Sequence, residues 1–196
     1  MNFKSKRARF ARPKFVGMVN ITTSRRAQVW VETVIYTLIG LAVIGVLLAV
    51  SKPKIEEMKD KIVIEQTITS LNDISNKIYD VQISPGNKRI LNLKISKGKF
   101  FIDAAKNEIG WILESHYKYS EVGRSVNLGN LRVLTEEAGP YLITVSMNYT
   151  TNLTYSGKEE YFEVEGSPSP YKLSVENIGI PVGQTLTNVD LVVVDS

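Results

Sequence analysis

The first long pattern in the chain is an apolar run, and it predicts a helix that crosses a membrane. The 18 residues Thr33–Val50 contain no charged side chain, and Val29–Val31 can lengthen the run at its start. A helix needs about 20 mainly apolar residues to span the hydrocarbon core of a bilayer. We therefore expect a transmembrane segment over about residues 29–50, with one acidic residue, Glu32, at its head.

After residue 50 the apolar positions recur at three or four residues, which is the period of a helix with one buried face. This pattern predicts one nearly continuous helix from about residue 29 to about residue 80, on the order of 75 Å long at 1.5 Å per residue. Pro53 should kink it, because proline has no N–H to donate to the carbonyl of Ala49. The apolar stripe consists of Ile55, Met58, Ile62, Ile64, Ile68, Leu71, Ile74 and Ile78, and charged residues such as Asp60 lie between.

The segment Ser84–Asn87 reads Ser-Pro-Gly-Asn, a turn signal that ends the predicted helix at about residue 83. From Arg89 onward apolar and polar positions alternate, which is the period of a β-strand. We expect the fold class α+β: a long N-terminal helix over residues 28–83, followed by an antiparallel β-rich head over 88–196, as a sheet or a sandwich. The expected strands lie at 90–96, 99–103, 109–114, 125–134, 141–150, 160–165, 171–176 and 189–194.

Charge changes this picture at the N-terminus. Residues 1–27 hold eight basic residues and no acidic one, whereas the rest of the chain holds 16 basic and 20 acidic residues, a net charge of −4. The basic pI of about 9.1 therefore comes from the first 27 residues. No basic patch interleaved with aromatic residues follows them, so we predict no nucleic-acid partner. The eight are Lys4, Lys6, Arg7, Arg9, Arg12, Lys14, Arg25 and Arg26.

The same charges orient the predicted transmembrane segment. Eight basic residues precede it, and four lysines follow it within about 20 residues. By the positive-inside rule the N-terminus lies in the cytoplasm and the head lies outside the cell. The four lysines are Lys52, Lys54, Lys59 and Lys61.

Candidate catalytic groups are few. The absence of cysteine removes disulfides, zinc–thiolate clusters and thiol nucleophiles. His116, the single histidine, has no cysteine or G-x-S-x-G serine to serve, and we interpret it as a surface or edge-strand residue. The acid pairs Glu136-Glu137 and Glu159-Glu160 are neighbours that point to opposite faces of a strand. The sequence predicts no enzyme, no cofactor and no metal site, although a lone calcium ion among loop carboxylates stays open.

Two further patterns concern modification and packing. Asn148 and Asn152 each begin an Asn-x-Thr acceptor triplet, so both are candidates for N-glycosylation if the head lies outside the cell, although chance also produces such triplets. Gly45 and Ala49 form a small-xxx-small pair, and Gly40 precedes them. Small residues let membrane helices pack closely, so we expect helix association through this segment.

Glu32 has two interpretations. It can be a favourable charge in the first turn of a helix, close to the positive end of the helix dipole. It can also have a cationic partner, because an acid near the membrane is costly when it is unpaired. Both would hold if the chain were cut just before it, since a new amino terminus would then lie beside the acid.

The sequence Arg25-Arg26-Ala27-Gln28-Val29, followed by Glu32 and the apolar run, closely resembles the class III signal peptides of archaeal type IV pilins and archaellins. The resemblance implies that a prepilin peptidase recognises Arg25 and Arg26 and cuts between Ala27 and Gln28, which removes residues 1–27 as a basic leader. Glu32 would become the fifth residue of the mature chain, where many type IV pilins carry a glutamate thought to pair with a neighbouring subunit's amino terminus. The resemblance is specific over residues 25–50 and only architectural over the head.

The resemblance implies a structural subunit of a type IV pilus-like surface filament, used in adhesion or motility and anchored in the cytoplasmic membrane before assembly. The implied partners are copies of itself or sibling pilins, prepilin peptidase, the pilus assembly machinery and membrane lipid. The alternative is a single-pass membrane protein that does not polymerise and displays a β-rich binding module at the cell surface. An ordinary secretory signal cut after Ala49-Val50-Ser51 fits less well, because its apolar region would be too long.

Overall fold

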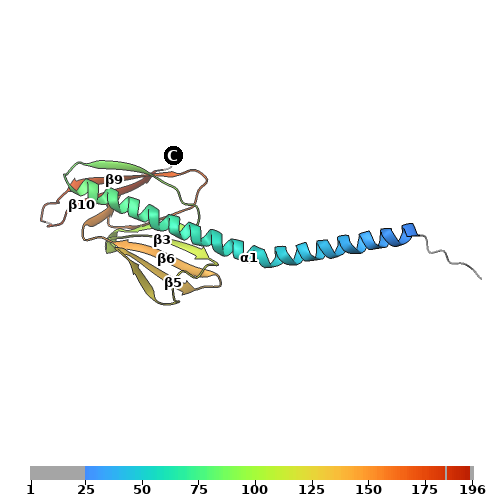
Figure 1. Ribbon diagram of the computed structural model, residues 1–196. Coiled ribbons are helices and arrows are strands. Elements are labelled where there is room, and N and C mark those ends of the chain that lie inside the picture. The colour runs from blue at the N-terminus through green and yellow to red at the C-terminus, as the bar shows by residue number, and fades with distance from the viewer. Residues whose placement is uncertain (1–24, 184, 195–196) are drawn as a thin grey trace, which may run out of the picture. The chain divides into compact units, whose positions relative to one another are not determined.

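The computed structural model describes residues 25–183 and 185–194, with side chains from residue 29 onward. The chain divides into two compact units, Met1–Leu48 and Ala49–Ser196. One long helix, α1 (Arg25–Gln82), contributes to both units, and a 3-10 helix, η1 (Ala104–Lys106), and strands follow it (Figure 1). The strands are β1 (Lys88–Leu93), β2 (Lys99–Asp103), β3 (Glu108–Ser115), β4 (Ser125–Leu128), β5 (Leu131–Glu137), β6 (Tyr141–Asn148), β7 (Asn152–Tyr155), β8 (Tyr161–Glu165), β9 (Tyr171–Gly179) and β10 (Asn188–Val194).

The predicted long helix and the α+β fold class are confirmed. The helix α1 has 58 residues and continues through Pro53, so the proline does not end it. Ion pairs one turn apart support its exposed side beyond the apolar run, such as Lys54 with Glu57 at 2.7 Å and Lys77 with Asp80 at 3.1 Å. Such pairs each stabilise a helix by roughly 0.2–0.5 kcal/mol. The kink at Pro53 stays a prediction.

The head contains two sheets. One has four strands in the order β1-β9-β10-β7, and the other has six in the order β4-β5-β6-β3-β2-β8. Pairing is antiparallel except between β10 and β7, which run parallel. The expectation of an antiparallel β-rich head is therefore confirmed, with one parallel pair at the edge of the four-stranded sheet.

Two strands were not expected as separate elements, and several strand ends differ from the expected ones by one to three residues. The expected strand 125–134 is two strands, β4 and β5, joined by Gly129-Asn130, where Gly129 has φ +62. A two-residue Gly-Asn connection is itself a hairpin signal that the run of alternating residues concealed. The strand β7 was not expected, because the predicted strands end at residue 150 and resume only at residue 160.

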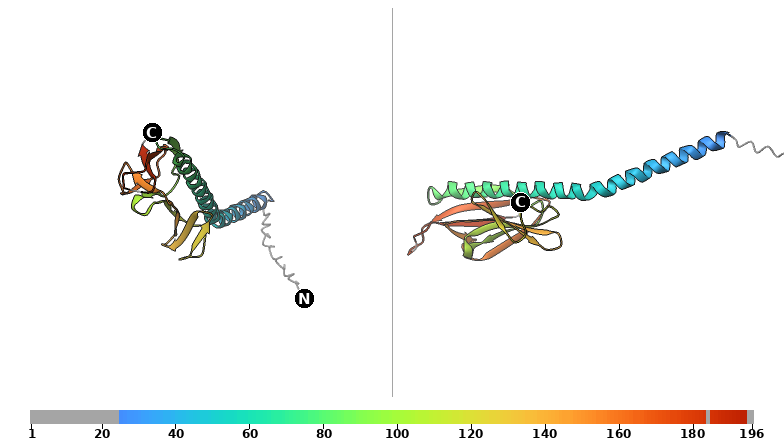
Figure 2. Two further views of the ribbon diagram at one scale, coloured as in Figure 1. Left: turned by 90° about the vertical axis from the view of Figure 1, so that its left-hand side faces the viewer. Right: turned by 60° about the horizontal axis from the view of Figure 1, so that its bottom comes forward.

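The core of the head lies between the inward faces of the sheets and the second part of α1. Phe100 and Trp111 meet edge to face at its centre, with ring centroids 5.3 Å apart. Tyr155 of β7 stacks on Phe162 of β8 at 4.0 Å, which joins the two sheets along one side. The right-hand view in Figure 2 shows the second part of α1 lying over the head. From this part the head buries Ile64, Leu71, Ile74, Ile78 and Val81 completely.

The apolar stripe after residue 50 is therefore buried only in part, which corrects the expectation of one continuous buried face. Ile55, Met58 and Ile62 are 50%, 65% and 51% exposed, although they follow the helical period. Asp60, which the pattern places among the exposed charges, is 6% exposed instead. The reason is that the head covers a face of α1 that passes through Asp60 and Ile64 rather than through the residues of the first apolar turns.

Candidate functional site

The first part of α1 presents an apolar surface that nothing in the described chain covers. Every residue from Val29 to Val50 is exposed, including Trp30 at 69% and Leu48 at 66%. This helix is long and apolar enough to cross a membrane. In water such a surface would be costly, at roughly 25 cal/mol for each square ångström of apolar area. The segment is therefore suited to lipid or to other apolar helices.

The threonine hydroxyls of this segment are also suited to lipid or to apolar helices, because they form hydrogen bonds within α1. The hydroxyl of Thr33 donates to the carbonyl oxygen of Val29 at 2.9 Å, and that of Thr37 donates to the carbonyl oxygen of Thr33 at 2.8 Å. Threonine side chains that bond one turn back leave no donor exposed to hydrocarbon. Glu32 lies one residue before this pair, is exposed, and is the only ionisable carboxylate between residues 29 and 50.

The predicted packing residues lie on open helix surface. A Cβ atom built on Gly40 or on Gly45 would have no atom within 4 Å apart from the neighbouring backbone of its own helix, and Ala49 is exposed. Glycine costs roughly 1 kcal/mol relative to alanine inside a helix. Two glycines without any local contact to accommodate are consistent with close approach of another helix.

The predicted cleavage site lies at the beginning of the described chain. The backbone of Arg25, Arg26, Ala27 and Gln28 belongs to the first turn of α1, and Glu32 follows one turn later. The side chains of these four residues, and all of the leader before them, lie outside the described residues. Leader recognition, cleavage and the pairing of Glu32 therefore stay predictions.

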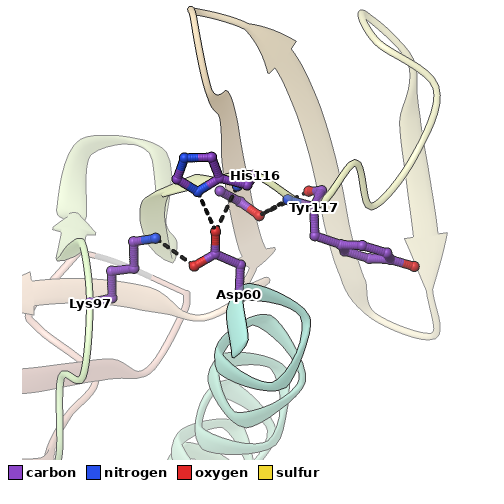
Figure 3. A network of polar contacts seen from close by, with 5 residues as sticks. Asp60, Lys97, His116 and Tyr117 are labelled. Carbon is purple, nitrogen blue, oxygen red and sulfur yellow. Dashed lines mark hydrogen bonds and ion pairs between the residues drawn. The ribbon is translucent and has the colours of Figure 1, made fainter. Parts of the chain in front are cut away.

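A polar cluster joins α1 to the head at Asp60 (Figure 3). The ammonium of Lys97 donates to Oδ1 of Asp60 at 2.6 Å, and the backbone N–H of His116 donates to Oδ2 at 2.6 Å. The Nδ1 atom of His116 lies 3.0 Å from the same Oδ2 and donates to it in the tautomer that carries a proton there. The side chain of Asp60 is only 9% exposed, so this carboxylate depends on these donors.

The loops of the head bring the two partners to Asp60. Lys97 precedes Gly98, whose φ of +80 and close approach to the backbone of Ile112 leave no room for a side chain. His116 directly follows β3, and the hydroxyl of Ser115 accepts from the N–H of Tyr117 at 2.9 Å, which holds the chain in a tight turn. Sequence reasoning missed this cluster, because its members are 37 and 56 residues apart along the chain.

The surroundings of Asp60 act on its pKa in opposite directions. Burial alone would raise the pKa of the carboxyl. The Lys97 ammonium, the backbone N–H of His116 and the His116 ring outweigh burial and hold the pKa below its ordinary value of 3.8. His116 is thus a half-exposed residue at the end of a strand, as interpreted from the sequence, and it has a structural partner that the sequence did not indicate.

The two candidate glycosylation sites differ in the folded head. Asn148 ends β6 and is exposed, and so is Thr150 two residues later. Tyr149 between them points inward, and burial raises the pKa of its hydroxyl to about 12. Asn152, in contrast, uses its side-chain N–H to donate to Oδ1 of Asn188 at 2.9 Å. The hydroxyl of Thr154 in the second triplet is buried and donates to Asp190 at 2.7 Å.

If the head lies outside the cell, we therefore expect the protein to carry an N-linked glycan at Asn148 and none at Asn152. Glycosylation requires a free side-chain amide and an accessible threonine, which the folded head offers only at the first triplet. Mass spectrometry of glycopeptides from the cells that make the protein checks this. Asn148→Gln should remove the added mass and Asn152→Gln should leave it unchanged, whereas a glycan on Asn152 would contradict the prediction.

The described residues 25–183 and 185–194 contain no group of three or more histidine and acidic residues that could hold a metal ion. Glu136, Glu137, Glu159 and Glu160 are exposed on the head. Enzymatic activity stays untested, and no geometry in this part of the chain favours it.

Comparison of the chain with protein-family models, with curated proteins and with solved structures found no match. The functional interpretation therefore depends on the apolar surface of α1, the sequence that precedes it and the head attached to it.

Proposed function

We propose that this protein is a structural subunit of a type IV pilus-like surface filament. The observation that supports this most is the exposed apolar surface of Val29–Val50, on a helix that continues without interruption into a compact head. Before assembly the segment would lie in the cytoplasmic membrane, with the N-terminus in the cytoplasm and the head outside. After assembly it would pack against the same segment of neighbouring subunits.

The transfer of the apolar segment from lipid to protein is nearly neutral in hydrophobic free energy. Lipid tails are as apolar as leucine side chains, so exchanging lipid for protein changes the hydrophobic free energy little. Close packing and specific polar contacts must then fix the position of each subunit. Gly40 and Gly45 would supply close approach, and Glu32 would pair with the amino terminus of a neighbour, created by cleavage before Gln28. Contacts of this kind repeat without closing, as a helical filament requires.

The three half-exposed residues beyond the span favour a filament over a simple anchor. Ile55, Met58 and Ile62 continue the apolar surface for 12 residues past Val50. In a single-pass anchored protein these side chains would face water beside the membrane. In a filament the helices of neighbouring subunits would cover them, which gives these residues a role that the anchored alternative lacks.

A prepilin peptidase would cut the leader, assembly machinery would extract the subunit from lipid, and copies of this chain or sibling pilins would form the filament. The head would provide the outer surface, for adhesion or motility.

The test is to shear filaments from intact cells and determine the N-terminus of this chain in them. We expect the mature protein to begin at Gln28 and to be enriched in the sheared fraction. A mature chain that begins at Met1 or at Lys52 would contradict the proposal. A chain that begins at Gln28 but stays with the membrane after shearing would instead favour a non-polymerising subunit.

A further inference from the structure

The strand β4 ends the six-stranded sheet and is exposed along its whole length. It pairs with β5 on one side only. Val126 and Leu128 of this strand are 38% and 39% exposed, although both are apolar. The strand contains no charged residue and no proline, which are usual devices that prevent an edge strand from pairing with another chain.

The free edge of β4 presents backbone groups that are ready to pair. The carbonyl oxygen of Thr135 in β5 accepts from the N–H of Gly123 at 2.8 Å, so Thr135 and every second residue before it direct their backbone groups toward β4. The residues of β4 opposite these bond to β5, and the other two do not. Those two are Ser125 and Asn127, whose N–H and C=O groups point away from the sheet and have no hydrogen-bond partner among the described residues.

The other edge strands are protected against such pairing, each in a different way. β1 begins with two basic residues and lies beside charged residues of α1. The N–H of Leu153, on the outer edge of β7, already donates to the side chain of Asn107 at 2.7 Å. β8 carries Glu163 and Glu165 on one face, so a second copy would bring like charges together. Among the described strands that end the two sheets, β4 alone is both uncharged and open.

We propose that β4 pairs with β4 of a second copy of this chain, antiparallel and about a two-fold axis. The strand is complementary to itself in one register, in which Val126 lies opposite Val126 and Ser125 of each copy lies opposite Asn127 of the other. This register uses all the free backbone groups of β4, because the two residues of each Ser125–Asn127 pair exchange both N–H···O bonds. It also sets apolar against apolar side chains on one face and polar against polar on the other.

The charges around β4 fit a second copy. Residues 125–131 contain no Lys, Arg, Asp or Glu. Arg124, at the end of the contact, is paired with Glu121 at 3.1 Å. Glu136 and Glu137 lie on the part of β5 beyond the first residue of β4, which in an antiparallel pair is level with the uncharged hairpin turn of the second copy. Like charges therefore do not meet across the two strands.

A contact of one strand with its own copy closes at two copies and joins two six-stranded sheets into one continuous sheet. The helix contacts of a filament, in contrast, repeat without closing. The pairing of β4 involves the head alone, so it does not rest on the proposed function.

The test uses single cysteines, because the natural chain has none and an introduced one can cross-link only to its copy. The full chain with Val126→Cys is purified, reconstituted in liposomes and oxidised, and the cross-linked dimer is measured against time. In the proposed register the two Cβ atoms lie about 4.5–5.5 Å apart, close to the spacing in a disulfide. Glu165→Cys is the matched control on the opposite edge of the same sheet, with a side chain that is 74% exposed. We expect Val126→Cys to cross-link at least tenfold faster.

A second pair of variants tests the backbone of the edge. Asn127→Pro removes the N–H that would donate to Ser125 of the second copy and removes no bond to β5. In the Val126→Cys chain it should slow cross-linking at least tenfold, whereas Asn127→Ala, which keeps the N–H, should leave the rate unchanged. Matching thermal unfolding curves show that the proline acts on pairing and not on the fold. If the proline lowers the stability of β4, the comparison of Val126→Cys with Glu165→Cys decides alone.

Three results would overturn the proposal. Cross-linking of Val126→Cys no faster than that of Glu165→Cys would show that β4 does not contact its copy. Equal rates for the equally stable Asn127→Pro and Asn127→Ala chains would show that the backbone edge is not used. Cross-linking of Val126→Cys in intact cells to a different protein, and not to its copy, would show that the edge has another occupant.

Discussion

A chain with Glu32→Ala is expected to insert into the membrane as wild type does and to form no filaments. The carboxylate is exposed at the head of the apolar segment, so the isolated subunit does not need it for its fold. In the proposed filament it is the one acid available to the amino terminus of a neighbour within an apolar surrounding. Its loss would leave that positive charge buried without a partner.

The size of this effect follows from the cost of an unpaired buried charge. Removing one partner of a buried ion pair costs about 3–5 kcal/mol. At about 1.4 kcal/mol for each factor of ten, a loss of 3 kcal/mol per subunit weakens assembly on the order of 100-fold. Filaments would then be absent at subunit concentrations that suffice for wild type.

The measurement compares sheared filaments with membrane-bound chain for wild type and variants. Glu32→Gln keeps the size of the side chain and removes its charge, so it should fail as Glu32→Ala does. Glu57→Ala is the matched control, because it removes a partly exposed carboxylate, paired with Lys54, from the same helix beyond the apolar run. Normal filaments from Glu32→Ala would contradict the pairing of Glu32 with a neighbouring amino terminus. Glu32 would then be only a favourable charge at the start of the helix.

Replacing Asp60 is expected to lower the stability of the head strongly. Asp60→Ala removes the acceptor for both Lys97 and the backbone N–H of His116, at a position where the carboxylate is 9% exposed. A hydrogen bond to a charged group contributes about 1.5–3 kcal/mol, and the unpaired backbone N–H adds a cost of similar size. We expect the free energy of unfolding to fall by about 3 kcal/mol. Asp60→Asn, which keeps one acceptor oxygen, should lose less.

The same residue makes head stability depend on pH. The pKa of Asp60 is lower in the folded chain than its ordinary value of 3.8, so the unfolded chain binds its proton first as the pH falls. The contribution of Asp60 is therefore fully present above about pH 5 and is lost as the pH falls through the folded pKa, below about pH 4. The exposed pair of Glu163 and Lys99 acts in the same direction, because Lys99 lowers the pKa of Glu163.

A comparison of wild type with Asp60→Asn separates the pH dependence that comes from Asp60 from that of the Glu163–Lys99 pair. The unfolding of the full chain in detergent can be followed by the fluorescence of Trp111, which is buried and donates from Nε1 to the carbonyl oxygen of Lys97 at 3.2 Å. The stability difference between the two chains should be largest near neutral pH and should shrink below pH 4. A difference that stays constant down to pH 2 would show that the charge of Asp60 does not contribute.

Local sequence patterns predict the elements of this protein, but not which surfaces of those elements are covered. The apolar run, the extension of the helix past residue 50 and the change to alternating residues after Arg89 are all local periodicities, and the structure confirms each. Ile55, Met58 and Ile62 follow the same helical period as the apolar residues from Ile64 to Ile78, yet they are exposed whereas the later ones are buried or partly buried. Periodicity shows which side of a helix is apolar, but not whether another element covers it.

The tertiary structure decided the features that depend on distant segments. Asp60 is a buried acceptor because the backbone N–H of His116, 56 residues further along the chain, donates to it. Asn177 likewise donates to the carbonyl oxygen of Val81 near the end of α1, 96 residues earlier. The same holds for the parallel pairing of β7 with β10 and for the difference between Asn148 and Asn152.

By itself, then, the sequence determined a membrane-length helix continued by an amphipathic one and a β-rich head, because backbone periodicity and turn chemistry act over a few residues. It also carries the Arg25-Arg26-Ala27-Gln28 segment and Glu32, on which the filament proposal depends. Which side of the helix is covered, which polar groups are paired and which apolar groups remain exposed was decided only by the tertiary structure. Burial is a property of surfaces brought together by the whole chain, and no local pattern specifies the partner.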